Sequence, residues 1–191
     1  MCGIVGYTGS DIAKNILVTG LKRMEYRGYD SSGVALEVGE GTAAHLDVIR
    51  RVGKVAGLES ELTNVDSDAT CGIGHTRWAT HGAPSDTNSH PHMADSGKIA
   101  VVHNGIIENY LELKELLMAR GKKFHSETDT EVVANLIEFY YDMGCDFKDA
   151  VQKAVSRVEG SYALGVLCRD YPDTIIGVKK DSPLIFGYGQ G

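Results

Sequence analysis

The feature that most constrains this chain is a cysteine at position 2, followed directly by a short apolar stretch. Cys2 is small enough to allow removal of the methionine before it, which would leave a thiol and a free α-amine on one residue. The ordinary pKa of an α-amine is about 7.7–8.0, so near neutral pH part of it is free base. It can take the proton of the thiol and return it to a leaving amine. A residue used in this way must be held in place, and Ile4 and Val5 predict a buried strand that would do so.

The opening residues also predict a nucleophile. A nucleophile beside its own base is the arrangement of N-terminal nucleophile enzymes. Gly3 brings no side chain that would obstruct a substrate approaching the sulfur. The alternative is that Cys2 is an incidental residue on a frayed end, since terminal residues are often poorly ordered. A strand that starts at Ile4 argues against fraying, but these residues alone leave both interpretations open.

Length and composition set the outer limits. The 191 residues suffice for one substantial core, and the net charge of −7 argues against a broad nucleic-acid or anionic-membrane surface. No apolar run approaches the roughly 20 residues of a membrane span, and no secretory signal precedes the first strand. The four cysteines show no C-x-x-C pairing. We therefore expect a cytoplasmic location and neither a nucleic-acid nor a membrane partner.

Strands and helices are expected in separate runs. Apolar periodicity predicts helices over residues 12–24, 54–62, 106–117, 132–141 and 147–158, the first with Ile12 and Ile16 on its apolar side. Further strands are expected at residues 34–38, 44–49, 70–76, 99–103, 162–167, 174–178 and 183–186. This grouping favours a layered α+β fold over alternating βαβ units. The chain ends close behind its last expected strand, which predicts a domain truncated at its C-terminus.

Two residues that follow a buried strand could stabilise an oxyanion. A thiolate that attacks an amide needs hydrogen-bond donors for the negative oxygen that develops. Asn104 offers a side-chain NH₂ group, and Gly105 offers a backbone N–H with no side chain in front of it. Alone, however, an Asn-Gly pair is most often a type I′ turn.

A polar-aromatic loop and a later acidic residue could bind an amino-acid substrate. Arg77 is a fitting bidentate partner for an α-carboxylate, and Asp129 is a candidate partner for an α-ammonium. Trp78, the one tryptophan of the chain, could be a mobile lid that keeps water away from a thioester. Thr80 and His81 line the same loop.

Each of these assignments has a structural alternative. Asp129 could simply favour a helix N-terminus, because Thr128 and Glu131 form a capping box around it. Arg77 could belong to a surface ion pair, and Trp78 could fill the core. Taken one at a time, the residues favour these alternatives.

A histidine cluster offers a competing chemistry. Five of the seven histidines fall in one part of the chain, namely His75, His81, His90, His92 and His103. Two of them flank a proline and could supply metal ligands. No H-E-x-x-H motif, cysteine pair or clear ligand spacing completes a zinc site. We therefore expect no metal.

Five ordered motifs resemble one family. From residue 2 to its end, the chain is similar to the glutaminase domains of the glucosamine-6-phosphate synthases, the isomerising glutamine:fructose-6-phosphate amidotransferases. The motifs that carry the resemblance are residues 2–6, 25–31, 75–82, 102–109 and 126–131. Phosphoribosylpyrophosphate amidotransferases share the N-terminal cysteine and the His-Asn-Gly element. They usually carry a tyrosine-containing loop where this chain has Arg77 to His81, so they fit less well.

The resemblance implies both a fold and a reaction. The fold is an α+β N-terminal nucleophile hydrolase, a four-layer αββα sandwich with two antiparallel sheets. The reaction is hydrolysis of L-glutamine through a γ-glutamyl thioester on Cys2, with no cofactor. Asn104 and Gly105 would form the oxyanion hole. The resemblance also assigns substrate-binding residues, Arg77, Thr80, His81, Gly105 and Asp129, with Trp78 closing the lid and Arg27 in a motif that supports the nucleophile.

The resemblance also implies what surrounds this domain. Residues 1–191 would form one type-2 glutamine amidotransferase domain, incomplete at its C-terminus and without the sugar-isomerase domains. In the full-length enzyme, expected to be a homodimer, those domains use the ammonia to convert fructose 6-phosphate to glucosamine 6-phosphate. The alternatives are an amino-acid-binding module without catalysis and a metal-dependent hydrolase.

Overall fold

Two antiparallel sheets form the centre of the fold. The structure, a computed structural model, describes residues 2–65 and 67–189. The first sheet has the order β1-β4-β2-β3 and the second the order β5-β6-β7-β8. The strands of the first sheet are β1 (Gly3–Thr8), β2 (Ser31–Val38), β3 (His45–Val52) and β4 (Cys71–Arg77). Those of the second are β5 (His92–Met93), β6 (Ile99–Ile107), β7 (Gly160–Cys168) and β8 (Ile175–Lys180).

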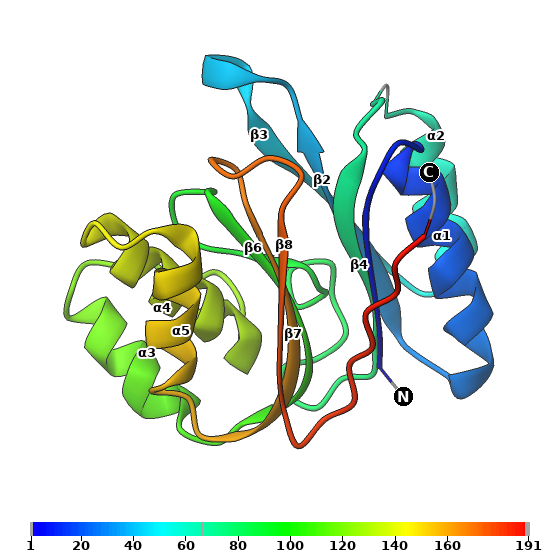
Figure 1. Cartoon of the computed structure of the whole chain (residues 1–191). Helices are drawn as coiled ribbons and strands as arrows, with labels where there is room; N and C mark the ends of the chain where they lie inside the picture. The colour runs from blue at the N-terminus through cyan, green and yellow to red at the C-terminus, as the bar shows by residue number, and fades with distance from the viewer. Residues whose placement is uncertain (1, 66, 190–191) are drawn as a thin grey trace.

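Helices cover the outer face of each sheet. Figure 1 shows α1 (Ala13–Met24) and α2 (Val55–Thr63) on the side of the first sheet. The other side carries three helices, α3 (Tyr110–Met118), α4 (Asp129–Asp142) and α5 (Phe147–Val155). Short 3-10 turns occupy Glu25–Arg27 and Gly41–Ala43. This is the predicted four-layer αββα sandwich. Among the described residues, no helix combines the length and the apolarity needed to cross a membrane.

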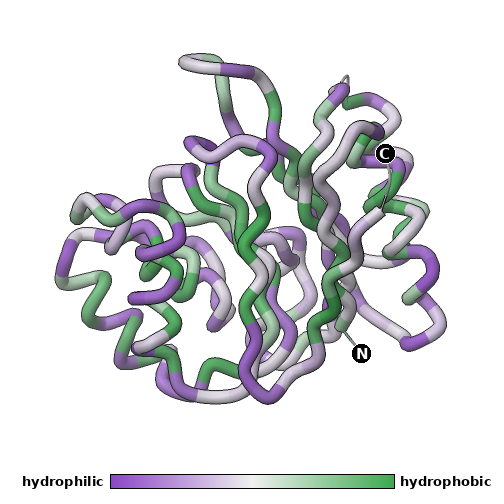
Figure 2. Tube along the Cα trace, viewed as in Figure 1, coloured by the Kyte–Doolittle hydropathy of each residue, from purple (hydrophilic) through white to green (hydrophobic). Residues whose placement is uncertain are grey.

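Apolar side chains fill the three spaces between the four layers. The core between the sheets consists mainly of small and β-branched residues, among them Ala35, Ile73, Ala100 and Val102. The core under α1 and α2 is richer in leucine, and Figure 2 shows the hydrophobic residues concentrated along the central strands. Fully burying one such side chain stabilises the fold by about 1.5–3 kcal/mol. Cys71 and Cys168 are buried as predicted.

Helix α1 approaches β4 closely because β4 contains glycines. A Cβ at Gly72 would lie 3.0 Å from Cδ1 of Leu17, and one at Gly74 would lie 3.3 Å from Cδ1 of Leu21. Both leucines are fully buried. The glycines therefore fix the position of β4, the strand that ends in the predicted substrate loop.

Three sequence-based expectations about the elements are wrong. The helix expected from Ile106 begins at Tyr110, because β6 continues to Ile107 and pairs with β7 as far as Gly160. Residues 183–186 are not a strand. Ile12 and Ile16 are 38% and 37% exposed, since the buried face of α1 is formed by Ala13, Leu17, Val18 and Leu21.

We predict that Leu21→Ala lowers the free energy of unfolding by about 2–5 kcal/mol, because it leaves a cavity between α1 and β4. Leu111, which is 60% exposed, gives a matched control. Leu111→Ala should stay within about 0.5 kcal/mol of the parent chain. Urea unfolding measures both; equal effects would show that α1 does not pack as described.

Candidate active site

Strand pairing fixes the position of Cys2. The β1–β4 ladder begins with Gly3 opposite Thr76, so the residue before β1 lies beside the chain that leaves β4. The backbone N–H of Trp78 donates to Sγ of Cys2 at 3.1 Å. A Cβ at Gly3 would lie 2.5 Å from Sδ of Met24, which gives this glycine a packing reason besides the predicted clearance for a substrate. The expected anchoring of the N-terminus by a strand is confirmed.

The environment of Cys2 keeps its thiol protonated. Burial raises the pKa of Cys2 above its ordinary value, while the N–H of Trp78 and the charge of Arg77 act in the opposite direction. A buried thiol of raised pKa is a weak nucleophile at neutral pH. Chemistry at this sulfur therefore needs a group that accepts its proton.

Gly105 lies inside β6 and not in a turn. It stands opposite Tyr162 of β7, and its φ of 130° lies in a region that L side chains rarely adopt. A Cβ at this position would be 2.0 Å from the backbone oxygen of Ser161. The type I′ turn interpretation is therefore wrong, because this glycine is required by the close approach of β7.

The side chain of Asn104 is held from the opposite sheet. Nε2 of His75, on β4, lies 2.8 Å from Oδ1 of Asn104. The amide oxygen is thus occupied. In the sequence, His75 belongs to the histidine cluster and to the motif at residues 75–82, but neither pattern predicts its contact with Asn104.

Arg77 is buried, with part of its guanidinium unsatisfied. Its Nη2 donates to the backbone oxygens of His81 and Gly82. Its Nη1 is buried without a hydrogen-bond partner among the described residues. No ion pair between described residues includes Arg77, so the surface ion pair is wrong. Burial lowers the pKa of Arg77, and an arginine remains charged at neutral pH.

Asp129 has a structural role and also faces the same site. It is the first residue of α4, and the side chain of Thr128 accepts a hydrogen bond from the N–H of Glu131, which is one half of the predicted capping box. The other half is absent, because the N–H of Thr128 donates to Oγ of Ser126 and not to Glu131. Oδ2 of Asp129 accepts the N–H of Ile107 at 2.9 Å. Its Oδ1 lies 3.9 Å from Nδ1 of His103. The carboxylate is buried and ties α4 to the end of β6.

Trp78 lies at the surface over the loop that contains Gly28. It is 55% exposed, so the core-filling interpretation is wrong. A Cβ at Gly28 would lie 3.1 Å from Cζ3 of the indole. Asp30, to which the sequence analysis gave no role, accepts the N–H of Ala79 and donates its own N–H to the oxygen of Arg77 at 2.8 Å. Its place within a motif was the only sequence signal.

One pocket of about 980 Å³ brings all the predicted site residues together. It lies where the ends of β1, β4, β6 and α4 meet. Its lining includes Cys2, Gly3, Arg27, Arg77, Trp78, Thr80, His81, Asn104, Gly105 and Asp129. Ser182 to Ile185, which the sequence analysis did not place here, form part of the wall. The roles predicted for these residues are compatible with this arrangement.

The buried histidines pack against one another. The rings of His75 and His90 stack with centroids 4.2 Å apart, and His92 meets His90 edge to face. Burial lowers the pKa of all three rings, so they are neutral. No group of three or more histidine, cysteine or acidic residues within residues 2–65 and 67–189 has a metal-binding arrangement.

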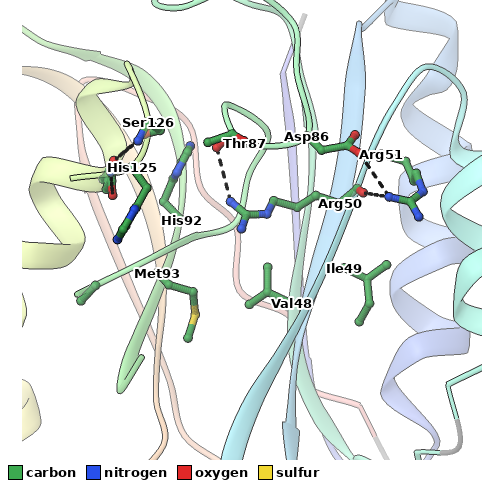
Figure 3. Close-up of a pocket in the computed structure, with 12 residues that line it drawn as sticks. Val48, Ile49, Arg50, Arg51, Asp86, Thr87, His92, Met93, His125 and Ser126 are labelled. Carbon is green, nitrogen blue, oxygen red and sulfur yellow. Dashed lines mark hydrogen bonds and ion pairs between the residues drawn. The ribbon is translucent and has the colours of Figure 1, made fainter. Parts of the chain in front are cut away.

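A separate pocket of about 460 Å³ lies between β3 and the start of α4 (Figure 3). Arg50 crosses it, and its Nη1 donates to the oxygen of Thr87 at 3.4 Å. Arg51 donates to Oδ2 of Asp86 at 3.2 Å. None of its described lining residues belongs to the predicted site.

Comparisons with known proteins point in one direction. A family described as glutamine amidotransferase domain matches residues 56–181. The whole chain aligns with 30% of the length of a glutamine--fructose-6-phosphate aminotransferase [isomerizing] from Caldanaerobacter subterraneus, and 56% of the aligned residues are identical. It also aligns with 31% of the length of the protein of the same name from Aquifex aeolicus, with 53% identity.

Solved structures share the fold. One is glutamine phosphoribosylpyrophosphate amidotransferase from B. subtilis. The alignment covers 88% of this chain and 35% of that chain, at 27% sequence identity and a TM-score of 0.71. The other is an allosteric regulatory enzyme of purine biosynthesis. The alignment covers 88% of this chain and 36% of that chain, at 28% sequence identity and a TM-score of 0.73. The predicted N-terminal nucleophile hydrolase sandwich is confirmed.

We predict that Gly105→Ala lowers the free energy of unfolding by about 2 kcal/mol or more, because it forces both a strained φ and a clash with β7. Gly57, inside α2 with nothing within 4 Å of a new Cβ, is the matched control. Gly57→Ala should stabilise the chain by about 0.5–1 kcal/mol. If urea unfolding shows Gly105→Ala to be neutral, β6 and β7 are not paired as described.

Proposed function

Since this chain belongs to the glutamine amidotransferase domain family, we propose that its pocket hydrolyses the side-chain amide of L-glutamine with Cys2 as the nucleophile. The observation that carries the proposal is the meeting of Cys2 with Arg77, Asn104, Gly105 and Asp129 in one pocket. Elements far apart in the sequence supply the parts that acyl transfer from a free amino acid requires.

The proposed reaction begins when removal of Met1 frees the α-amine of Cys2. This amine takes the proton of the thiol, whose raised pKa makes a base necessary. The sulfur bonds to the amide carbon, and the carbonyl oxygen becomes an oxyanion. Nδ2 of Asn104 and the N–H of Gly105 donate to it; removing one such donor typically lowers kcat about 10²–10³-fold.

Collapse of the tetrahedral intermediate completes the first half of the reaction. The C–N bond breaks, and the α-ammonium of Cys2 returns its proton, so that ammonia leaves and a γ-glutamyl thioester remains. Water then attacks the thioester, the C–S bond breaks, and the products are glutamate and the free thiol of Cys2. Trp78 lines the pocket and is 55% exposed, and movement of its indole would control the entry of water.

The main chain of the bound glutamine would be held by two charged residues. Nη1 of Arg77, buried without a partner among the described residues, is a donor available to an α-carboxylate. Asp129 presents a buried carboxylate for the α-ammonium, although one of its oxygens already accepts the N–H of Ile107. Thr80 and His81 contribute the adjoining loop, and Arg27, which also lines the pocket, would belong to the motif that supports Cys2.

The activity of the whole protein is a further part of this proposal. The chain spans about 30% of the length of the curated relatives that it matches, which are named glutamine--fructose-6-phosphate aminotransferase [isomerizing]. We infer that the domain continues beyond residue 191 and is followed by sugar-isomerase domains. Those domains would use the ammonia to make glucosamine 6-phosphate from fructose 6-phosphate, in a cytoplasmic homodimer and without a cofactor.

We predict that the 191-residue chain releases glutamate from glutamine slowly and forms no glucosamine 6-phosphate. Both products are measured side by side in the presence of fructose 6-phosphate. Formation of glucosamine 6-phosphate by this chain alone would refute the proposal that the sugar-isomerase domains are needed to make it.

We further predict that Cys2→Ala lowers glutamate release by at least about 10³-fold while glutamine still binds. Cys145, also a free and partly exposed cysteine, provides the matched control, and Cys145→Ala should keep the parental rate. Glutamine binding without any glutamate release from the parent chain would instead favour a binding module.

A further inference from the structure

His75 reaches Asn104 across the space between the two sheets. It lies on β4 between β1 and β2, opposite Ile4 and Gly33, and its side chain is fully buried. Its Nε2 lies 2.8 Å from Oδ1 of Asn104. An amide oxygen accepts hydrogen bonds and cannot donate them, so this contact requires the proton of the ring to be on Nε2.

We propose that His75 is a positioning residue for the oxyanion hole, whose Nε2–H holds the Asn104 amide with Oδ1 toward β4 and Nδ2 toward Cys2. The inference rests on the proposed function, because it concerns a donor that acts during glutamine hydrolysis. It assigns His75 a role in aligning a neighbouring group and no contact with the substrate.

The orientation of the Asn104 amide decides whether it helps or opposes the reaction. The two ends of an amide are nearly the same size, so packing hardly distinguishes them and the hydrogen-bond network must do so. Turned by half a rotation, Asn104 would present Oδ1 to the developing negative charge. An acceptor in that place would repel the oxyanion in a site where charges are poorly screened by water.

The hydrogen bonding of the His75 ring favours the required tautomer. Nδ1 of His75 has no hydrogen-bond partner among the described residues, whereas Nε2 has one. Burial lowers the pKa of His75 to about 3, so the ring is neutral and carries a single proton. On Nε2 that proton meets the oxygen of Asn104 at a heavy-atom distance of 2.8 Å.

The ring of His75 packs within a cluster of buried, neutral histidines. His75 stacks on His90 with an angle of 20° between the planes. Nδ1 of His90 accepts the backbone N–H of His103 at 3.3 Å, which places the proton of His90 on Nε2, 3.3 Å from Oγ1 of Thr130. The hydroxyl of Thr130 can then donate to Nδ1 of His103 at 2.9 Å or to Oδ1 of Asp129 at 3.4 Å, and Nε2 of His103 is buried without a hydrogen-bond partner among the described residues. The cluster therefore holds the His75 ring by stacking, and the hydrogen bond from His75 alone reaches Asn104.

The first test removes the donor and keeps the stacked ring. In His75→Phe, kcat for glutamate release should fall by about tenfold to hundredfold, with the KM for glutamine within about threefold of the parent value. His75→Gln, which carries a new N–H donor, should recover part of the loss. In an Asn104→Ala background, His75→Phe should cause little further loss, because both changes remove the same oxyanion donor.

The outcomes separate the two proposals. If the parent chain hydrolyses glutamine and His75→Phe keeps the parental kcat, or if the losses from His75→Phe and Asn104→Ala multiply, the positioning role is overturned. If the parent chain releases no glutamate, it is the proposed function that fails.

A second measurement does not depend on activity or on a variant that folds. Nitrogen-15 NMR of histidine-labelled parent chain reports which ring nitrogen of His75 carries the proton. The inference predicts protonated Nε2 and unprotonated Nδ1 at neutral pH. A proton on Nδ1 would turn Nε2 into an acceptor and contradict the inference.

Discussion

The site depends on the backbone pairing of β1 with β4. Their ladder runs from Gly3 opposite Thr76 to Thr8 opposite Cys71, and it starts one residue after Cys2. Chain ends usually fray, because few contacts hold them. Here the first strand is paired from its first residue, and the N–H of Trp78 reaches the sulfur of Cys2. The same pairing brings the end of β4, with Arg77, next to the N-terminus.

The space between the sheets changes character along its length. One part is closed by apolar residues such as Ile73 and Val102, and the other contains the polar residues His75 and His103. A buried polar group without a partner costs about 1–3 kcal/mol, so most of these groups are hydrogen-bonded to one another. Nη1 of Arg77 is buried without a partner among the described residues, and it lines the pocket that we assign to glutamine. A bound carboxylate would satisfy it.

Much of the architecture could be predicted from the sequence, because the spacing of apolar residues reports helices and strands locally. Long-range pairing could not be predicted in this way. Asn104 and Gly105 have the composition of a turn, yet they are part of β6 because β7 lies alongside. The same pairing delays the next helix to Tyr110. Residues 183–186 have the composition of a strand but do not form one. An apolar pattern alone does not show whether a segment pairs with a neighbouring strand.

The candidate residues were recognised from motifs, and the structure shows the contacts that motifs do not contain. The hydrogen bond from His75 joins two strands of different sheets, and the bonds of Asp30 hold the loop that carries Trp78. Such contacts follow from the packing of the sheets, and the motifs that contain His75 and Asp30 do not reveal which residues these two contact. The motifs identify the residues that would react with the substrate, but they do not identify the hydrogen bonds that orient those residues.

The central claim is that the sulfur of a processed Cys2 attacks a glutamine side chain bound in this pocket. Mass spectrometry of the chain after incubation with a γ-electrophilic glutamine analogue tests it most directly. The account predicts one adduct, on Cys2 of a chain that has lost Met1, and protection from labelling by excess glutamine. An adduct on another residue, or equal labelling of a chain that retains Met1, would contradict it.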